Sequence, residues 1–260
     1  MVIRRIREHV TAHNWFAVGI DLAIVVAGVF IGTQATLWNE QRIEQEQSRS
    51  YRARLIEELE FNARQYRQQV AYYKQARAHG LATLRSLQSP TSAQGRDFLI
   101  DAYQTTQIDA VSAKRFIYDE MVSAGLVDRL GPANVQAAAS DYYLILEDAE
   151  RKLQENLPYR TIMRTIMAYP AQERIRHQCG DIAVYHRDRI IGVRLPDKCD
   201  VDLDPSLVAA AVSRIRSEAS LVGELTRYLA SLDEKLDALE YGLIGSKDLH
   251  ALLLSTNQKT

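Results

Sequence analysis

The stretch WFAVGIDLAIVVAGVFIGTQATLWNE, residues 15–40, decides how this chain is organised. Between residues 15 and 37 it carries one charged side chain, that of Asp21. A helix needs about 20 predominantly apolar residues to cross the hydrocarbon core of a bilayer, and this stretch is long enough. Trp15 and Trp38 stand at its ends, where aromatic rings favour the boundary between lipid and water. We therefore predict a transmembrane helix over residues 15–38, with Trp15 and Trp38 at the membrane interfaces.

Two other interpretations of this stretch have to be weighed. A cleavable signal peptide also begins with basic residues, but its apolar region is shorter, and Thr33-Gln34-Ala35 is a poor cleavage site. A buried helix of a soluble protein is also apolar, but no other part of this chain is as continuously apolar. The sequence therefore favours an uncleaved membrane anchor.

The orientation of the span follows from the lengths of its flanks. Arginines lie on both sides of it, so the count of positive charges is nearly tied. A short basic tail tends to stay in the cytoplasm, whereas long domains cross the membrane largely regardless of charge. We expect residues 1–14 to form a cytoplasmic tail and residues 39–260 an extracytoplasmic domain.

The span also carries a pattern typical of helix pairing. Gly28 and Gly32 form a small-xxx-small pair, and Asp21 and Ala35 fall on the same side of a helix. Small residues let two helices approach closely, and a polar side chain can form a hydrogen bond across the contact. The alternative is that glycine is common in membrane helices and that Asp21 stays hydrated near the interface. The predicted association residues are Asp21, Gly28, Gly32, Gln34 and Ala35.

The end of the stretch, GVFIGTQATLWNE (residues 28–40), carries a resemblance. It resembles the end of the N-terminal helix in an uncharacterised family of bacterial single-pass membrane proteins, with the pattern Gly-x5-Gln-x3-Trp-Asn-Glu. Residues 51–65 and 118–143 are similar to later helical segments of that family. The resemblance implies a single-pass protein of the bacterial inner membrane, and it brings no catalytic residues with it.

The rest of the chain favours an all-α fold. Residues 38–79 contain no glycine or proline and show apolar residues three and four apart, which is typical of an amphipathic helix. Asp204-Pro205 is a helix start, and an apolar seam then runs to Leu243 with one polar interruption at Glu218. This seam predicts one long C-terminal helix, either a bundle helix or a self-associating coiled coil. The predicted fold is a transmembrane helix that continues into a bundle of long helices.

Cys179 and Cys199 bracket the one segment that does not look helical. Its apolar residues predict two short strands around a turn at residues 186–188. Cysteines at both ends of a segment placed outside the cytoplasm suggest a disulfide that closes a loop over residues 179–199. Two free thiols are one alternative. A zinc site that includes His177 and His186 is another, but structural zinc sites usually have closer cysteine pairs.

The balance of 32 basic and 33 acidic residues argues against a nucleic-acid partner. We find no catalytic motif, no metal site and no cofactor signature. The favoured function is a membrane-anchored, non-enzymatic interaction or scaffolding protein, which pairs with a second copy or with another membrane protein. Two alternatives remain: a ligand-sensing bundle that works through a partner, and an enzyme or metal protein that uses the histidines and cysteines.

Overall fold

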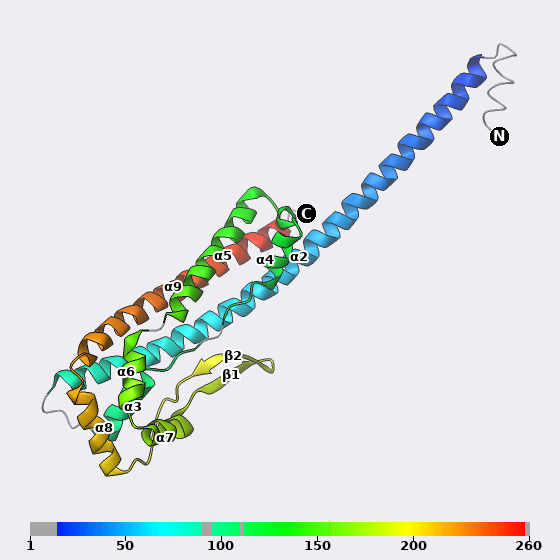
Figure 1. The fold of residues 1–260 in the computed structure, drawn as a ribbon. Coiled ribbons are helices and arrows are strands. Elements are labelled where there is room, and N and C mark those ends of the chain that lie inside the picture. Colours follow the sequence, from blue (N-terminus) through cyan, green and yellow to red (C-terminus); the bar gives the residue numbers. More distant parts are fainter. Residues whose placement is uncertain (1–14, 90–94, 110–111, 156, 258–260) are drawn as a thin grey trace. The chain divides into compact units, whose positions relative to one another are not determined.

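A computed structural model describes residues 15–89, 95–109, 112–155 and 157–257 (Figure 1). The predicted cytoplasmic tail, residues 1–14, and the side chain of Trp15 lie outside this description. Contacts divide the chain into two compact units, Met1–Arg52 and Ala53–Thr260, and each is described by itself. Helix α2, Trp15–Gln88, supplies the described residues of the first unit and the first helix of the second.

The second unit is a helical bundle, which confirms the predicted all-α fold. The two other long helices are α5, Ala133–Gln154, and α9, Leu221–Asn257. The shorter elements are α3 (Arg96–Gln104), α4 (Phe116–Ser123), the 3-10 helix η1 (Val127–Leu130), α6 (Pro158–Ile166), α7 (Tyr169–Cys179) and α8 (Pro205–Ser217). Within the described residues the only sheet is a hairpin of β1, Ile182–His186, and β2, Arg189–Arg194.

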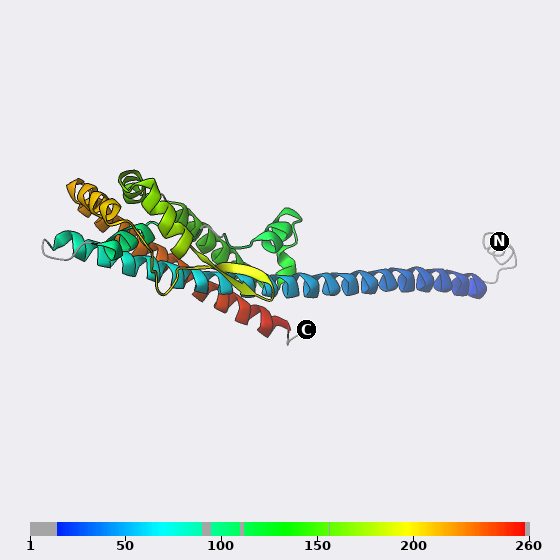
Figure 2. The same cartoon turned by 90° about the horizontal axis from the view of Figure 1, so that it is seen from below.

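Helix α9 runs antiparallel to residues 53–88 of α2 and to α5 (Figures 1 and 2). Lys74 of α2 pairs with Glu240 of α9, and Arg77 of α2 pairs with Asp233 of α9. The second pair lies later on α2 and earlier on α9, as expected for antiparallel helices. Ser246 of α9 donates a hydrogen bond of 3.1 Å to the backbone oxygen of residue 59. The core between these helices is rich in aromatic side chains, and its tyrosines are at most 3% exposed: Tyr66, Tyr72, Tyr73, Tyr103, Tyr142, Tyr143, Tyr159 and Tyr228.

Two side-chain amides of α2 hold non-helical segments against the bundle. Asn62 is fully buried, and it both donates to the backbone oxygen of Lys114 and accepts from the backbone N–H of the same residue, each at 2.7 Å. Gln75 bonds the backbone N–H and the backbone oxygen of Leu195 in the same way, at 3.1 and 3.3 Å. Each amide satisfies a donor and an acceptor that no helix or sheet satisfies.

The hairpin predicted between the cysteines is confirmed, with its turn at the predicted place. Tyr185 pairs with Ile190 and His186 with Arg189, so two residues form the turn. Both turn residues, Arg187 and Asp188, have positive φ angles of 47° and 62°. This backbone matches the twist of the flanking strands in a two-residue hairpin.

The prediction of one continuous helix from Asp204 onward is wrong, because the chain breaks between α8 and α9. The helix start is confirmed: Asp204 Oδ1 accepts from the backbone N–H of Ser206 at 2.8 Å. The break falls at Glu218, whose Oε1 accepts from the backbone N–H and the hydroxyl of Ser220, at 3.2 and 2.6 Å. Such local side-chain bonds compete with the helical ladder. The polar interruption of the seam is therefore a helix end.

Candidate functional sites

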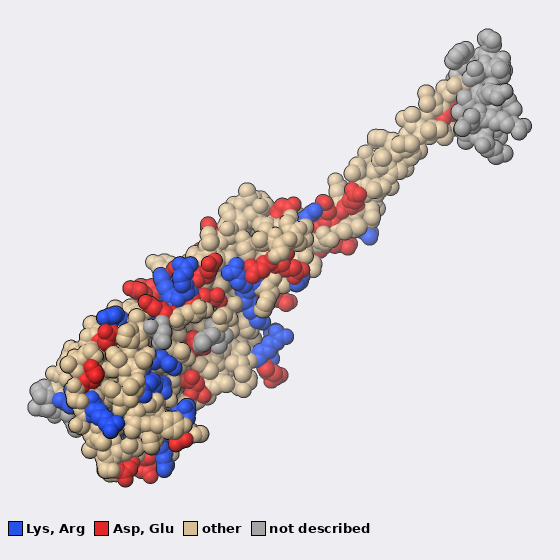
Figure 3. Space-filling view, in the orientation of Figure 1, with Lys and Arg blue, Asp and Glu red and all other residues tan. Residues whose placement is uncertain are grey.

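The first candidate is the apolar part of α2. Among the described residues it is the one helix long and apolar enough to cross a membrane, and none of its most apolar window is buried. Phe16 is 79% exposed and Trp38 is 69% exposed. In Figure 3 the N-terminal part of α2 is tan over most of its length. The core helix of a soluble protein is mostly buried, unlike this window, whereas a signal segment would have the same length and composition.

Two hydroxyl side chains within this part of α2 form hydrogen bonds inside the helix. The hydroxyl of Thr33 donates to the backbone oxygen of Phe30 at 2.9 Å, and that of Thr36 donates to the backbone oxygen of Gly32 at 3.1 Å. Helices use such bonds where no water is present to satisfy hydroxyls.

The predicted association residues fall into two groups on the helix. At about 100° per residue, Asp21, Gly32 and Ala35 lie within about 40° of Gly28. Gln34 lies about 120° away from Gly28, so it does not share their face, although it was predicted to act with them. A Cβ built at Gly28 or Gly32 would meet nothing within 4 Å, which leaves both backbones open to close approach.

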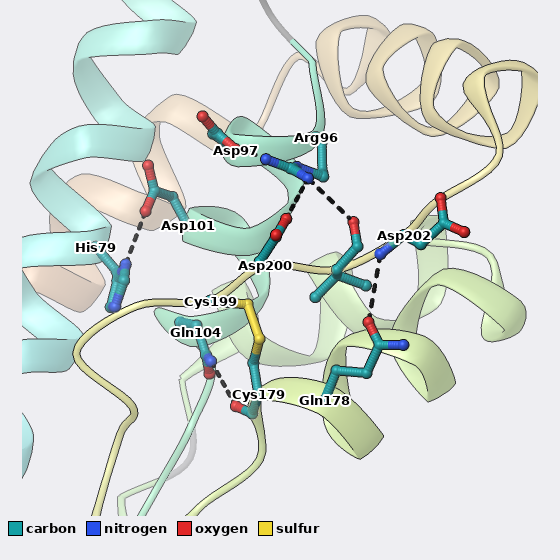
Figure 4. The surroundings of a disulfide bond; sticks show 11 residues. His79, Arg96, Asp97, Asp101, Gln104, Gln178, Cys179, Cys199, Asp200 and Asp202 are labelled. Carbon is teal, nitrogen blue, oxygen red and sulfur yellow. Dashed lines mark hydrogen bonds and ion pairs between the residues drawn. A yellow bond between two sulfur atoms is a disulfide. The ribbon is translucent and has the colours of Figure 1, made fainter.

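The second candidate is the disulfide between Cys179 and Cys199, which the structure shows with a Cα–Cα distance of 5.4 Å (Figure 4). Cys179 ends α7 and is 2% exposed. Its backbone oxygen accepts a hydrogen bond of 2.7 Å from Gln104 of α3. Arg96 of α3 pairs with Asp200 at 2.6 Å, directly after the second cysteine. The bridge therefore closes the loop that carries the hairpin, and α3 anchors both of its ends.

The disulfide bears on the alternative zinc site. Both sulfur atoms are bonded to each other and are not available as thiolate ligands. Of the two histidines, His177 is exposed on α7 and His186 is half-buried at the end of β1. Within the described part of the chain, no three histidine, cysteine, aspartate or glutamate side chains gather where they could hold a metal ion.

The third candidate was not predicted from the sequence. A cavity of about 350 Å³ lies between α5, α6 and α9. Apolar side chains line part of it, namely Ile108, Leu153 and Leu157. Two nearly buried polar residues of α9, Tyr228 and Lys235, line another part. Small-molecule sites commonly have this composition, with an apolar lining and a few convergent polar groups.

The sequence contains a signal for this cavity on α9. Tyr228, Ser231 and Lys235 are three and four residues apart, so they form a polar stripe on α9 beside the leucine seam. A lysine at such a spacing usually lies on a solvated face, but here Lys235 is 2% exposed. Only the packing of α5 and α6 against α9 distinguishes a buried lysine from a solvated one.

Comparison of the chain with models of known protein families, with curated proteins and with solved structures finds no match.

Proposed function

We propose that this chain is a single-pass, membrane-anchored protein without enzymatic activity, whose helical domain interacts with other proteins at the membrane. The exposed apolar part of α2 carries the proposal. Ile24, Val29, Phe30 and Ile31 are each more than 60% exposed. Burying one large apolar side chain stabilises a protein by about 1.5–3 kcal/mol, so leaving a whole stretch in water is strongly unfavourable. A lipid bilayer removes this cost.

The proposed location is the bacterial inner membrane, with the N-terminus in the cytoplasm and residues 39–260 on the other side. The disulfide supports an oxidising compartment for the helical domain, because such bridges are rare in the cytoplasm. The bacterial origin rests on the resemblance of residues 28–40 to the single-pass family, and it stays a prediction.

The anchor and its orientation are tested together on membranes from cells that produce the full chain. We expect the protein to resist extraction at alkaline pH and to keep its full length, with no cleavage after residue 35. Protease added to the outer face of spheroplasts should digest residues 53–260. Release of the chain by alkali would contradict the membrane anchor. Digestion of the domain only after lysis of the spheroplasts would contradict the orientation.

The interaction part of the proposal is that α2 pairs through the face of Asp21, Gly28 and Gly32, with a second copy of the chain as the first partner to test. Crosslinking in native membranes should give a dimer band, and Gly28→Leu and Gly32→Leu should reduce it strongly, because a leucine side chain keeps the two backbones apart. Gly19→Leu is the matched control: its Cβ also meets nothing within 4 Å. Gly19 lies about 180° from Gly28 around the helix.

Each outcome of this experiment has a consequence. A dimer that Gly28→Leu and Gly19→Leu weaken equally would rule out the predicted face. A chain that is monomeric in every variant would rule out self-association, and crosslinks to another membrane protein that Gly28→Leu abolishes would identify that protein as the partner.

A further inference from the structure

The cavity between α5, α6 and α9 has a polar wall whose hydrogen-bonding groups are mostly unused. Lys235 is 2% exposed, and its ammonium donates one hydrogen bond, of 3.2 Å, to the backbone oxygen of Glu155. Among the described residues it forms no ion pair. Tyr228 is 3% exposed, and its hydroxyl has no hydrogen-bond partner in the described part of the chain. An ammonium has three donors and a phenol one, so most of these donors have no acceptor among the described residues.

The remaining charged groups of the wall have partners within the protein. Glu155 accepts a hydrogen bond of 3.3 Å from Ser231, and Glu150 accepts one from the backbone of residue 113. Asp109 also lines the cavity, and its Oδ2 lies on the side of the hairpin, 3.6 Å from where a Cβ would stand at Gly192. Asp109 Oδ2 is also buried without a hydrogen bond among the described residues, but it lies toward the hairpin, so the unused capacity on the side of α9 is that of the donors.

Arg160 of α6 adds a second cation to this wall. Its Nε donates to the backbone oxygen of Thr106 at 2.9 Å, which is a neutral acceptor. Together Lys235 and Arg160 place two positive charges at the cavity, and among the described residues each donates a hydrogen bond to a backbone carbonyl and to no carboxylate. Burial lowers the pKa of Lys235, while the nearby Glu155 raises it, so the burial of this cation is unfavourable.

A buried cation is costly even where a carboxylate such as that of Glu155 lies nearby, and well-packed apolar residues usually stabilise a bundle more. The leucines of α9 on both sides of Lys235, such as Leu232 and Leu239, are fully buried in that way. A lysine and a tyrosine that face one cavity with free donors are explained if a ligand brings the acceptors. The apolar lining by Ile108, Leu153 and Leu157 requires that the rest of this ligand be apolar.

We infer that the cavity binds a small molecule with an apolar body and one carboxylate, which Lys235 and Tyr228 hold while the body contacts Ile108, Leu153 and Leu157. Arg160 adds positive charge beside the carboxylate. The volume of about 350 Å³ is near the lower end of the range for small-molecule sites, so it suits a short or single-ring molecule rather than a two-chain lipid. This site is independent of helix pairing through α2.

The test uses the full chain in lipid nanodiscs and titration calorimetry, with empty nanodiscs as the blank for partitioning. The probes are octanoate, 4-phenylbutyrate and 2-naphthoate, each compared with its matched alcohol. We expect at least one acid to bind with one molecule per chain and about tenfold or more tightly than its alcohol, because only the acid makes charge-assisted hydrogen bonds.

Substitutions then assign the contacts. Lys235→Met keeps the length of the side chain and should reduce the affinity for the acid to that for the alcohol, without lowering the melting temperature. Tyr228→Phe removes one hydroxyl and should lower the affinity for the acid several-fold. Lys247→Met is the matched control, because Lys247 is an exposed lysine on the same helix. This variant should bind the acid as tightly as the original chain does.

Three results would overturn the inference: no acid of the panel binds stoichiometrically, acids and alcohols bind equally, or Lys235→Met and Tyr228→Phe both bind the acid as tightly as the original chain. If Lys235→Met fails to fold, Tyr228→Phe decides alone, since the loss of one hydroxyl leaves the packing of the ring in place.

Discussion

At the scale of single residues, the two amides of α2 show how one side chain can replace an element of secondary structure. Asn62 bonds both backbone groups of Lys114 and also donates to the hydroxyl of Tyr142 at 3.2 Å. The segment before α4 is therefore held against α2 without a neighbouring strand. Such a contact depends on one residue, and no neighbour can take its place.

The Asn62 contact gives a prediction. Asn62→Ala should lower the free energy of unfolding by about 2–4 kcal/mol, because it leaves the backbone N–H and the backbone oxygen of Lys114 without their partner. Urea titration of the detergent-solubilised chain, followed by tyrosine fluorescence, measures this change. Arg67→Ala, an exposed position on the same helix, is the control and should stay within about 0.5 kcal/mol. A loss for Asn62→Ala no larger than for the control would show that the contact adds no stability.

At the scale of helices, glycines decide how closely α9 packs. A Cβ at Gly242 would stand 2.6 Å from the ring of Tyr66, which is itself 1% exposed and cannot move aside. A Cβ at Gly223 of the same helix would meet nothing within 4 Å. An added methyl group should therefore have opposite effects on the stability of the bundle at these two glycines.

We expect Gly242→Ala to destabilise the bundle by about 1–3 kcal/mol, because the added methyl group overpacks the contact with Tyr66. Gly223→Ala should stabilise it by up to about 1 kcal/mol, because alanine is the better helix former. Thermal unfolding of the two variants side by side checks both signs. If both variants are stabilised, α9 does not approach Tyr66 as closely as the structure shows.

The disulfide is a further device at this scale. Replacing both cysteines, Cys179→Ser with Cys199→Ser, should lower the free energy of unfolding by about 3 kcal/mol, since the bridge closes a loop of about 20 residues. Limited proteolysis should then cut within residues 180–198 in the variant or in the reduced chain, and not in the oxidised chain. Rapid alkylation of both cysteines without a reducing agent would show instead that no bridge is present.

Much of the architecture could be predicted from local patterns. The Asp204-Pro205 helix start, the hairpin around residues 186–188 and the cysteine pair are each determined by residues close in sequence. The break at Glu218 could not be predicted, because in the sequence a glutamate that ends a helix looks the same as a single polar residue within a continuous apolar seam. Only the structure shows its hydrogen bonds to Ser220. The cavity was missed because the burial of Lys235 depends on helices about 80 residues away in sequence.

At the scale of the whole bundle, the buried tyrosines of the core make the free energy of unfolding fall at alkaline pH. Burial raises the pKa of Tyr142 and Tyr228 to about 12. It also raises the pKa of Tyr66, Tyr73 and Tyr143 further above the usual value of 10. The folded state holds these protons where the unfolded state has released them.

This difference in proton binding between the folded and the unfolded chain determines how the free energy of unfolding changes with pH. The stability is fully present below about pH 10 and falls as the pH rises above the pKa of an exposed phenol, because only the unfolded chain can then ionise. We expect a steep loss of helix signal above pH 10 that coincides with the absorbance change of tyrosine ionisation. Gradual ionisation while the helix signal remains intact would contradict the burial of these phenols.

The separation of aromatic residue types between the two units has a practical consequence. Both tryptophans, Trp15 and Trp38, precede residue 53, whereas the tyrosines of the core all lie within residues 53–260. Tryptophan emission therefore reports the surroundings of the apolar helix, and tyrosine emission reports the folding of the bundle. Insertion into a bilayer and folding of the domain can thus be timed separately in one unlabelled sample, and their order during biogenesis can be measured directly.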